Sequence, residues 1–337
     1  MAYASRQSSY LFGSLGAVLQ VLAGWWDVFS HILFGSVDPW WNPAHLTLYC
    51  GIAVTILAVW RGLSVPLSSR SVRSTPTRFV NVAGLKLAGL GCAIEVVAGI
   101  WNEIVHRVLR TEPRIAPAHG LLVVGMLTVS LGMVIGLTIE YGMIRQGFIF
   151  PSKFRRLATV AFIFLVFAAI WLAASGSFIY LGRIFRAGQM NWLVAALLAL
   201  VAALVLVPAK RAMPGFGSGI AISIVFNIVS YVLLVFYAGA DTYIPWGFFP
   251  LIIFELLVFA LRRKIRFART VVLSSLVTGV FFWATYYPFT LYLFPWSFSL
   301  QAPLFLVLLG SGIGASLGDR VYAGLSSVVL RDVAASL

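Results

Sequence analysis

Residues 190–209 read MNWLVAALLALVAALVLVPA, an apolar run of 20 residues that contains no charged side chain. A helix of this length rises about 30 Å, which matches the hydrocarbon thickness of a lipid bilayer. The whole chain has the same character, because 61% of its residues are hydrophobic and only 10% are charged. A soluble domain carries about 25% charged residues. The sequence therefore predicts an integral membrane protein, built of helices because lipid offers the backbone no hydrogen-bond partner.

Apolar runs of similar length follow one another along the chain. They predict about ten transmembrane helices, at residues 10–34, 44–62, 79–109, 117–146, 155–183, 190–209, 215–239, 243–261, 268–295 and 299–318. The fold class that we expect is an all-α, multi-pass protein of the cell membrane.

Basic residues gather in alternate links between these predicted helices. The eighth link contains Arg262, Arg263 and Lys264, whereas the first and ninth links contain no basic residue. Because basic residues favour the cytoplasmic side, we expect both termini in the cytoplasm and the odd-numbered links outside. Orientation in lipid also accounts for the net charge of +14. No separate basic face with interleaved aromatic residues indicates nucleic-acid binding.

The N-terminal half contains an internal repeat. Residues 23–27 read Ala-Gly-Trp-Trp-Asp and residues 98–102 read Ala-Gly-Ile-Trp-Asn. Further matched pairs at nearly the same offset are Gln20 and Glu95, His31 and His106, Asp38 and Glu112, and His45 and His119. This pattern predicts a tandem duplication of a two-helix hairpin, with copies at about 16–62 and 91–137. We expect residues 1–150 to form a four-helix half that holds a metal site, and residues 151–337 a six-helix scaffold.

The matched polar residues fall on common helix faces. Positions i, i+7 and i+11 lie close to one line on an α-helix, so Gln20, Asp27 and His31 form one stripe. Their counterparts Glu95, Asn102 and His106 form another. The remaining two histidines follow prolines that suit a first helical turn. Each hairpin is thus expected to bring its two histidines to a similar depth near the outer face.

These residues are candidates for a metal site, because a buried acid in a membrane needs a partner and a bound cation would supply one. Imidazole and carboxylate suit copper, zinc, iron or nickel. The predicted ligands are Asp27, His31, His45, Asn102, Glu103, His106 and His119. Polar residues expected to support them are Gln20, Asp38, Glu95 and Glu112. Glu103 also precedes His106 with the Glu-x-x-His spacing of di-iron bundles.

The run from Trp26 through Asp27 and His31 to Pro43-Ala44-His45 resembles the metal-site segment of the C subunit of particulate methane and ammonia monooxygenases. The resemblance covers about 25 residues in each copy. It implies copper as the metal, with Asp27, His31 and His45 as ligands, and a protein that belongs to or is related to a membrane monooxygenase-type oxidoreductase complex. In the second copy His106 and His119 match, whereas Asn102 stands in place of the Asp.

Other functions are compatible with the same residues. The four histidines could serve as axial ligands of haem b in an electron-transfer or quinol protein, or the acids and histidines could form a relay in a proton-coupled transporter. Iron is the alternative metal. The protein could also be a purely structural subunit of a membrane complex, so the sequence leaves enzyme activity open. The sequence predicts no soluble domain that could receive electrons. An enzyme of this kind would therefore need partner subunits, and its substrate is expected to be a small hydrophobic molecule or a quinone. Glu255, in the eighth predicted helix, is either a functional acid or a structural charge paired near Arg262 and Arg263.

Overall fold

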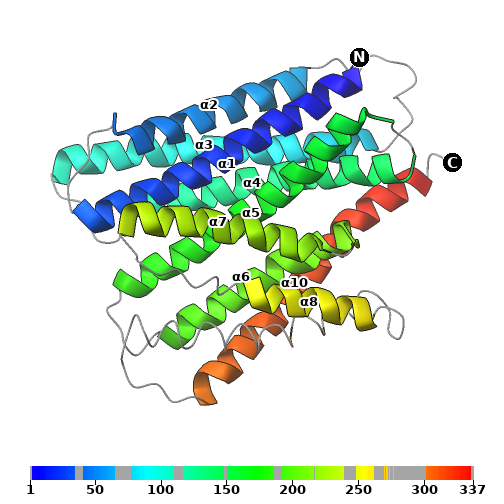
Figure 1. Cartoon of the computed structure of the whole chain (residues 1–337). Helices are drawn as coiled ribbons and strands as arrows, with labels where there is room; N and C mark the ends of the chain where they lie inside the picture. The colour runs from blue at the N-terminus through cyan, green and yellow to red at the C-terminus, as the bar shows by residue number, and fades with distance from the viewer. Residues whose placement is uncertain are drawn as a thin grey trace. The chain divides into compact units, whose positions relative to one another are not determined.

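The protein was analysed as a computed structural model, which describes much of the chain. The described residues are 2–34, 41–64, 77–109, 117–147, 150–184, 191–215, 217–238, 248–261, 269, 271, 273, 276 and 301–334. Its helices (Figure 1) are α1 (Ala2–Phe34), α2 (Pro43–Ser64), α3 (Thr77–Leu109), α4 (Pro117–Arg145), α5 (Lys153–Ile184), α6 (Asn191–Ala212), α7 (Ser218–Ala238), α8 (Phe248–Leu261) and α10 (Gln301–Ala334).

Several of these helices are suited to lipid. Within the ranges that the structure describes, five stretches are long and apolar enough to cross a bilayer: Pro43–Ser64, Val82–Val105, Pro117–Arg145, Lys153–Ala174 and Leu304–Gly324. The protein is therefore an α-helical membrane protein, and the number of apolar helices fits a multi-pass arrangement. The expected total of about ten spans stays a prediction, and most of the ninth, at 268–295, lies outside the described residues.

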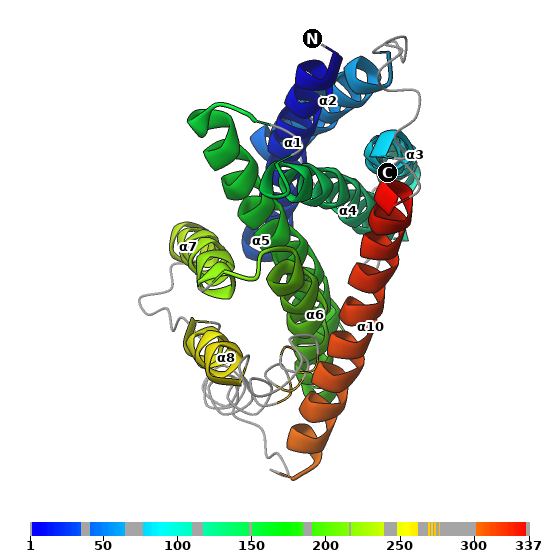
Figure 2. The ribbon, with the colours of Figure 1, turned by 90° about the vertical axis from the view of Figure 1, so that its right-hand side faces the viewer.

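The chain divides into two compact units, one of residues 1–173 with 325–337 and the other of residues 174–324. In the first unit α1 packs along α2, and α3 packs along α4. Contacts between α1 and α4 and between α2 and α3 then join the two hairpins. Figures 1 and 2 show these four helices side by side. A cavity lined by all four can therefore form where the hairpins meet.

Each hairpin has a close helix crossing at a glycine. A Cβ added at Gly51 of α2 would lie 2.9 Å from the carbonyl oxygen of Gly16 in α1. A Cβ added at Gly125 of α4 would lie 3.0 Å from the carbonyl oxygen of Gly91 in α3. Small residues let membrane helices approach this closely, and the approach replaces lipid contacts with tight van der Waals packing.

Close helix packing at glycines also occurs in the second unit. A Cβ at Gly310 or Gly314 of α10 would clash with the backbone carbonyl of Ala196 or Leu200 in α6. The two glycines are four residues apart and so lie on one face of α10. In the same unit α7 contacts α6 and α8.

Two helices are longer than their apolar runs. α1 begins at Ala2 rather than near residue 10, and α10 continues to Ala334 rather than ending near residue 318. The extra residues of α1 include Arg6 and Gln7, and those of α10 include four charged residues, so the uninterrupted apolar runs stop before them. They are nevertheless held by protein contacts, because Arg6 is buried and its Nε donates to the carbonyl oxygen of Gly62 at 3.4 Å. Asp319 of α10 pairs with Arg211 of α6.

Candidate metal centre

A close pair of buried ionisable side chains joins the two helices of the first hairpin. Nε2 of His45 lies 2.8 Å from Oδ1 of Asp27 in an ion pair, and the two side chains are 11% and 9% exposed. The start of α2 fixes the imidazole in place, because Oδ1 of Asn42 accepts from the backbone N–H of Ala44 at 2.9 Å. Asn42 is thus the N-cap and Pro43 the first helical residue, an arrangement that both residue types favour.

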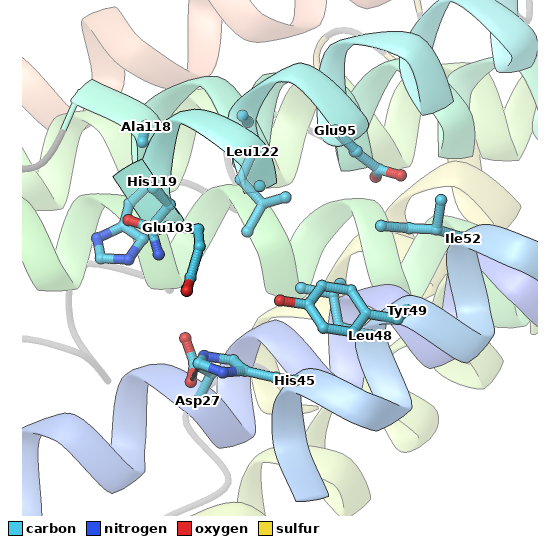
Figure 3. A pocket seen from close by; sticks show the side chains of 13 residues that line it. Asp27, His45, Leu48, Tyr49, Ile52, Glu95, Glu103, Ala118, His119 and Leu122 are labelled. Carbon is cyan, nitrogen blue, oxygen red and sulfur yellow. Dashed lines mark ion pairs between the residues drawn. The ribbon is translucent and has the colours of Figure 1, made fainter. Parts of the chain in front are cut away.

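The pair forms one wall of a small cavity of about 40 Å³. All four helices of the hairpins contribute to its lining. The polar lining residues are Asp27, His45, Tyr49, Glu95, Asn102, Glu103 and His119. Leu48, Ile52 and Leu122 are among the apolar ones. In Figure 3 the carboxylate of Glu103 and the hydroxyl of Tyr49 point toward the Asp27–His45 pair, and Glu95 lies farther along, near Ile52.

The cavity has an excess of acidic groups. Its lining contains the three carboxyl groups of Asp27, Glu95 and Glu103 and the imidazoles of His45 and His119, but neither lysine nor arginine. Glu95 is only 1% exposed, and neither of its carboxyl oxygens has a hydrogen-bond partner in the described part of the chain. The buried Oδ1 of Asn102 also lacks one there. Buried polar atoms are nearly always paired, so such atoms need an explanation such as an ion or water.

The structure brings together most of the predicted site residues that it describes. The cavity gathers Asp27, His45, Glu95, Asn102, Glu103 and His119 from both hairpins. Gln20 is buried but lies elsewhere, and its Nε2 donates to Oγ1 of Thr55 at 3.1 Å. His31 and His106 belong to α1 and α3, but the structure does not describe their side chains, and Asp38 and Glu112 lie outside the described residues.

The residues that line the cavity include types that can bind a metal ion. Imidazole nitrogen and carboxylate oxygen are suitable ligands for a divalent transition metal, and the unpaired oxygens of Glu95 and Asn102 agree with a site that accepts a cation. As placed, however, no three His, Cys, Asp or Glu side chains among those described lie close enough to hold one ion together. The residue types therefore fit a metal, whereas ligation would require side chains to turn inward.

Tyr49 is a lining residue that ligand spacing did not identify. It lies one turn after His45 on α2, and the two ring centroids are 6.3 Å apart. The signal was present in the sequence, because residues i and i+4 of a helix lie on the same face.

Glu255 in the second unit forms a buried ion pair with a lysine that the sequence analysis did not identify. Glu255 is fully buried and forms an ion pair with Lys210 of α6, which is also buried. Its carboxylate also accepts from the backbone N–H groups of Gly217 and Gly219, at 3.1 and 2.6 Å, at the start of α7. A carboxylate is favoured at a helix N-terminus. The carboxylate of Glu255 in α8 therefore has partners from both α6 and the start of α7. Arg262 and Arg263, the expected partners, lie outside the described residues.

Comparison with known proteins adds no further assignment. No protein-family model, no curated protein and no solved structure matches the chain.

Proposed function

We propose that this protein binds a divalent transition metal inside the membrane, at one site shared by its two N-terminal hairpins. The observation that carries the proposal is the composition of the cavity: three carboxyl groups and two imidazoles from four helices, with neither lysine nor arginine among the described lining residues. Placing charge in a membrane costs several kcal/mol even on lenient scales, about 2.5–3.5 kcal/mol per residue near the centre. A bound cation would offset that cost, and imidazole favours a transition metal over Mg²⁺ or Ca²⁺.

The size of the cavity favours an ion over a haem between His45 and His119. Its volume of about 40 Å³ corresponds to roughly three or four water molecules, since a cavity needs about 10–15 Å³ by this measure to hold one. An ion with one water fits that space. A porphyrin is many times larger, so haem ligation by this pair would require the hairpins to separate.

The equivalence of the two hairpins supports an origin by duplication. The glycine crossing of α1 and α2 involves Gly16 and Gly51, and that of α3 and α4 involves Gly91 and Gly125. The offsets, 75 between α1 and α3 and 74 between α2 and α4, are those of the sequence repeat. The same offsets relate Asp27 to Asn102 and His45 to His119. A single cavity with unequal halves is the natural product of such a duplication.

Copper is the metal we propose, because the first hairpin resembles the copper segment of the membrane monooxygenase C subunit. The same resemblance supports a role in an oxidoreductase complex with partner subunits and a small hydrophobic substrate or a quinone. The charge distribution of the links supports an orientation with cytoplasmic termini and with the histidine hairpins toward the outer face.

The test is metal analysis of the detergent-purified protein after loading with copper and removal of excess ion, with absorption and EPR spectra of the same sample. A shared site predicts one copper per chain in the wild type and none in either His45→Ala or His119→Ala. Two separate sites predict two coppers in the wild type and one in each variant. The matched control is Leu46→Ala, which changes the exposed neighbour of His45 and should retain the wild-type metal content. A wild type that retains no metal contradicts the proposal.

A further inference from the structure

Glu95 is set apart from the other acids of the cavity by its position. It is 1% exposed, it lines the cavity, and both of its carboxyl oxygens lack a hydrogen-bond partner within the described ranges. It precedes Asn102 and Glu103 by about two helical turns, so it lies deeper along α3 than the proposed ligands. Figure 3 shows it at the end of the cavity near Ile52.

The first hairpin has a glutamine at the position equivalent to Glu95. Gln20 occupies the equivalent position at the α1–α2 crossing, where it donates to Thr55. The residue equivalent to Thr55 is Val129, by the offset of 74 that relates α2 to α4. The helices approach each other equally closely at the two crossings. A Cβ added at Gly51 would lie 3.0 Å from the backbone nitrogen of Gln20. A Cβ added at Gly125 would lie 3.1 Å from the backbone nitrogen of Glu95. The second hairpin thus has an acid in place of the amide and no hydroxyl to bind it.

An acid in this environment favours its neutral form when no cation is near. Burying an isolated ionised carboxylate is so costly that the group takes up a proton instead. The neutral carboxyl still needs an acceptor for its O–H, and a cavity of about 40 Å³ can hold water for that purpose. A cation in the cavity reverses the preference, because the Coulomb attraction to a negative charge is strong where the effective dielectric constant is low.

We propose that Glu95 is the proton-exchanging acid of the cavity. In the metal-free protein Glu95 carries a proton, and entry of a divalent cation breaks its O–H bond and releases that proton to bulk water. The negative charge left on the carboxylate offsets part of the charge of the cation, and no electron is transferred. This inference rests on the proposed function, and it makes cation binding at this site a cation-for-proton exchange.

Other groups that face the cavity also exchange protons, so the test must isolate Glu95. They are Asp27 on α1, His45 and Tyr49 on α2, Glu103 on α3 and His119 on α4. Cys92 lies one turn before Glu95 on α3 and is buried. The Glu95→Gln variant introduces the residue that Gln20 already provides at the equivalent crossing, so it changes the acid with little change in shape.

The experiment is infrared spectroscopy of the metal-free protein in lipid nanodiscs, followed by titration with Zn²⁺, which is redox-silent. We expect a C=O stretching band of a protonated carboxyl in the wild type that is missing in Glu95→Gln and that disappears as Zn²⁺ binds. The control is Glu140→Gln, which removes another buried acid, on α4, whose Oε1 accepts from Oγ1 of Thr159 at 3.4 Å. This control should leave the Zn²⁺-sensitive band in place.

A second readout is the number of protons released for each Zn²⁺ bound, followed with a pH dye in weak buffer. Glu95→Gln should release one proton fewer than the wild type for each bound ion. Stoichiometric Zn²⁺ binding with an unchanged Glu95 band, or with equal proton release in both proteins, would overturn the exchange but leave the metal site standing. A wild type that binds no Zn²⁺ would overturn the metal site and the exchange together, even if the Glu95 band were present.

Discussion

Nε2 of His45 lies 2.8 Å from Oδ1 of Asp27, and this ion pair links α2 to α1 in the wall of the cavity. The contact uses one nitrogen of the histidine and one oxygen of the acid. A metal that bound both residues would have to replace the ion pair by two coordinate bonds. The proposed site therefore gives His45 a structural role before metal binding and a ligand role after it.

We predict that His45→Ala destabilises the metal-free protein as well as removing the metal. The variant removes the ion-pair partner of a buried carboxylate, which costs about 1–3 kcal/mol. The measurement is thermal unfolding in detergent with a chelator present. A double variant with Asp27→Asn should recover part of the loss, because an amide is cheaper to leave buried than an ionised acid. Equal stability of the wild type and His45→Ala would show that the ion pair contributes nothing before metal binding.

Gly125→Ala should destabilise the second hairpin. The added Cβ would lie 3.0 Å from the carbonyl oxygen of Gly91 and would also meet the side chain of Glu95, and overpacking of this kind costs about 1–3 kcal/mol. The matched control is Gly142→Ala on the same helix, where an added Cβ meets nothing within 4 Å. Because alanine is the better helix former by roughly 1 kcal/mol, this control should be neutral or stabilising. Unfolding midpoints in one detergent compare the two, and equal shifts would contradict the close crossing.

Two neighbouring cations of α6 should respond very differently to substitution. Lys210 and Glu255 are 2% and 0% exposed, whereas Arg211 and its partner Asp319 are 19% and 30% exposed. Removing one member of a buried pair costs about 3–5 kcal/mol, so Lys210→Met should be strongly destabilising. Arg211→Met loses a partly exposed pair and a cation–π contact with Tyr322, so its effect should be smaller.

A double variant checks the origin of the Lys210 effect. Lys210→Met with Glu255→Leu removes both charges and should be more stable than Lys210→Met alone, because no charge is left buried. Equilibrium unfolding of the two single variants and the double variant gives the coupling free energy. A coupling near zero would mean that the two residues act independently.

The proposed orientation can be tested by labelling single cysteines. Trp41, just before α2, and Phe150, between α4 and α5, are 59% and 89% exposed. In a background without Cys50 and Cys92, a membrane-impermeant maleimide should label Trp41→Cys in intact cells and Phe150→Cys only after permeabilisation. The reverse pattern would invert the proposed orientation, and labelling of both from outside would contradict a membrane crossing between them.

The sequence predicted the positions of the helices better than their full lengths. α2 and α4 begin at Pro43 and Pro117, because apolar run length and an N-terminal proline are both local signals. The start of α1 and the end of α10 were missed, since charged residues interrupt the apolar runs there and hydropathy records what lipid tolerates. A polar segment such as that around Arg6 can be helical because it is buried against protein, and that burial depends on residues distant in the sequence.

The same limit applied to the side-chain pairs. The repeat pointed to Asp27, His45 and His119, the Glu-x-x-His spacing pointed to Glu103, and all four line one cavity. The pairing of Glu255 with Lys210 was not predicted, because it depends on how α6 and α8 pack and not on their separation along the chain. Gln20 and Glu95 looked equivalent in the sequence, yet only the acid lines the cavity, whereas Nε2 of Gln20 donates to Thr55.

The pair formed by Lys210 and Glu255 has a consequence for synthesis if α6 and α8 span the bilayer, as the ten-helix prediction requires. The two residues are 45 positions apart, so in that arrangement α6 would meet lipid before its counter-charge is made. A lone ammonium is disfavoured in hydrocarbon, and α6 would wait at the insertion machinery, or with Lys210 reaching the headgroups, until α8 arrives. Entry of α6, α7 and α8 into the bilayer would then be a single concerted event, and truncation before residue 255 should leave a nascent chain that quality control recognises.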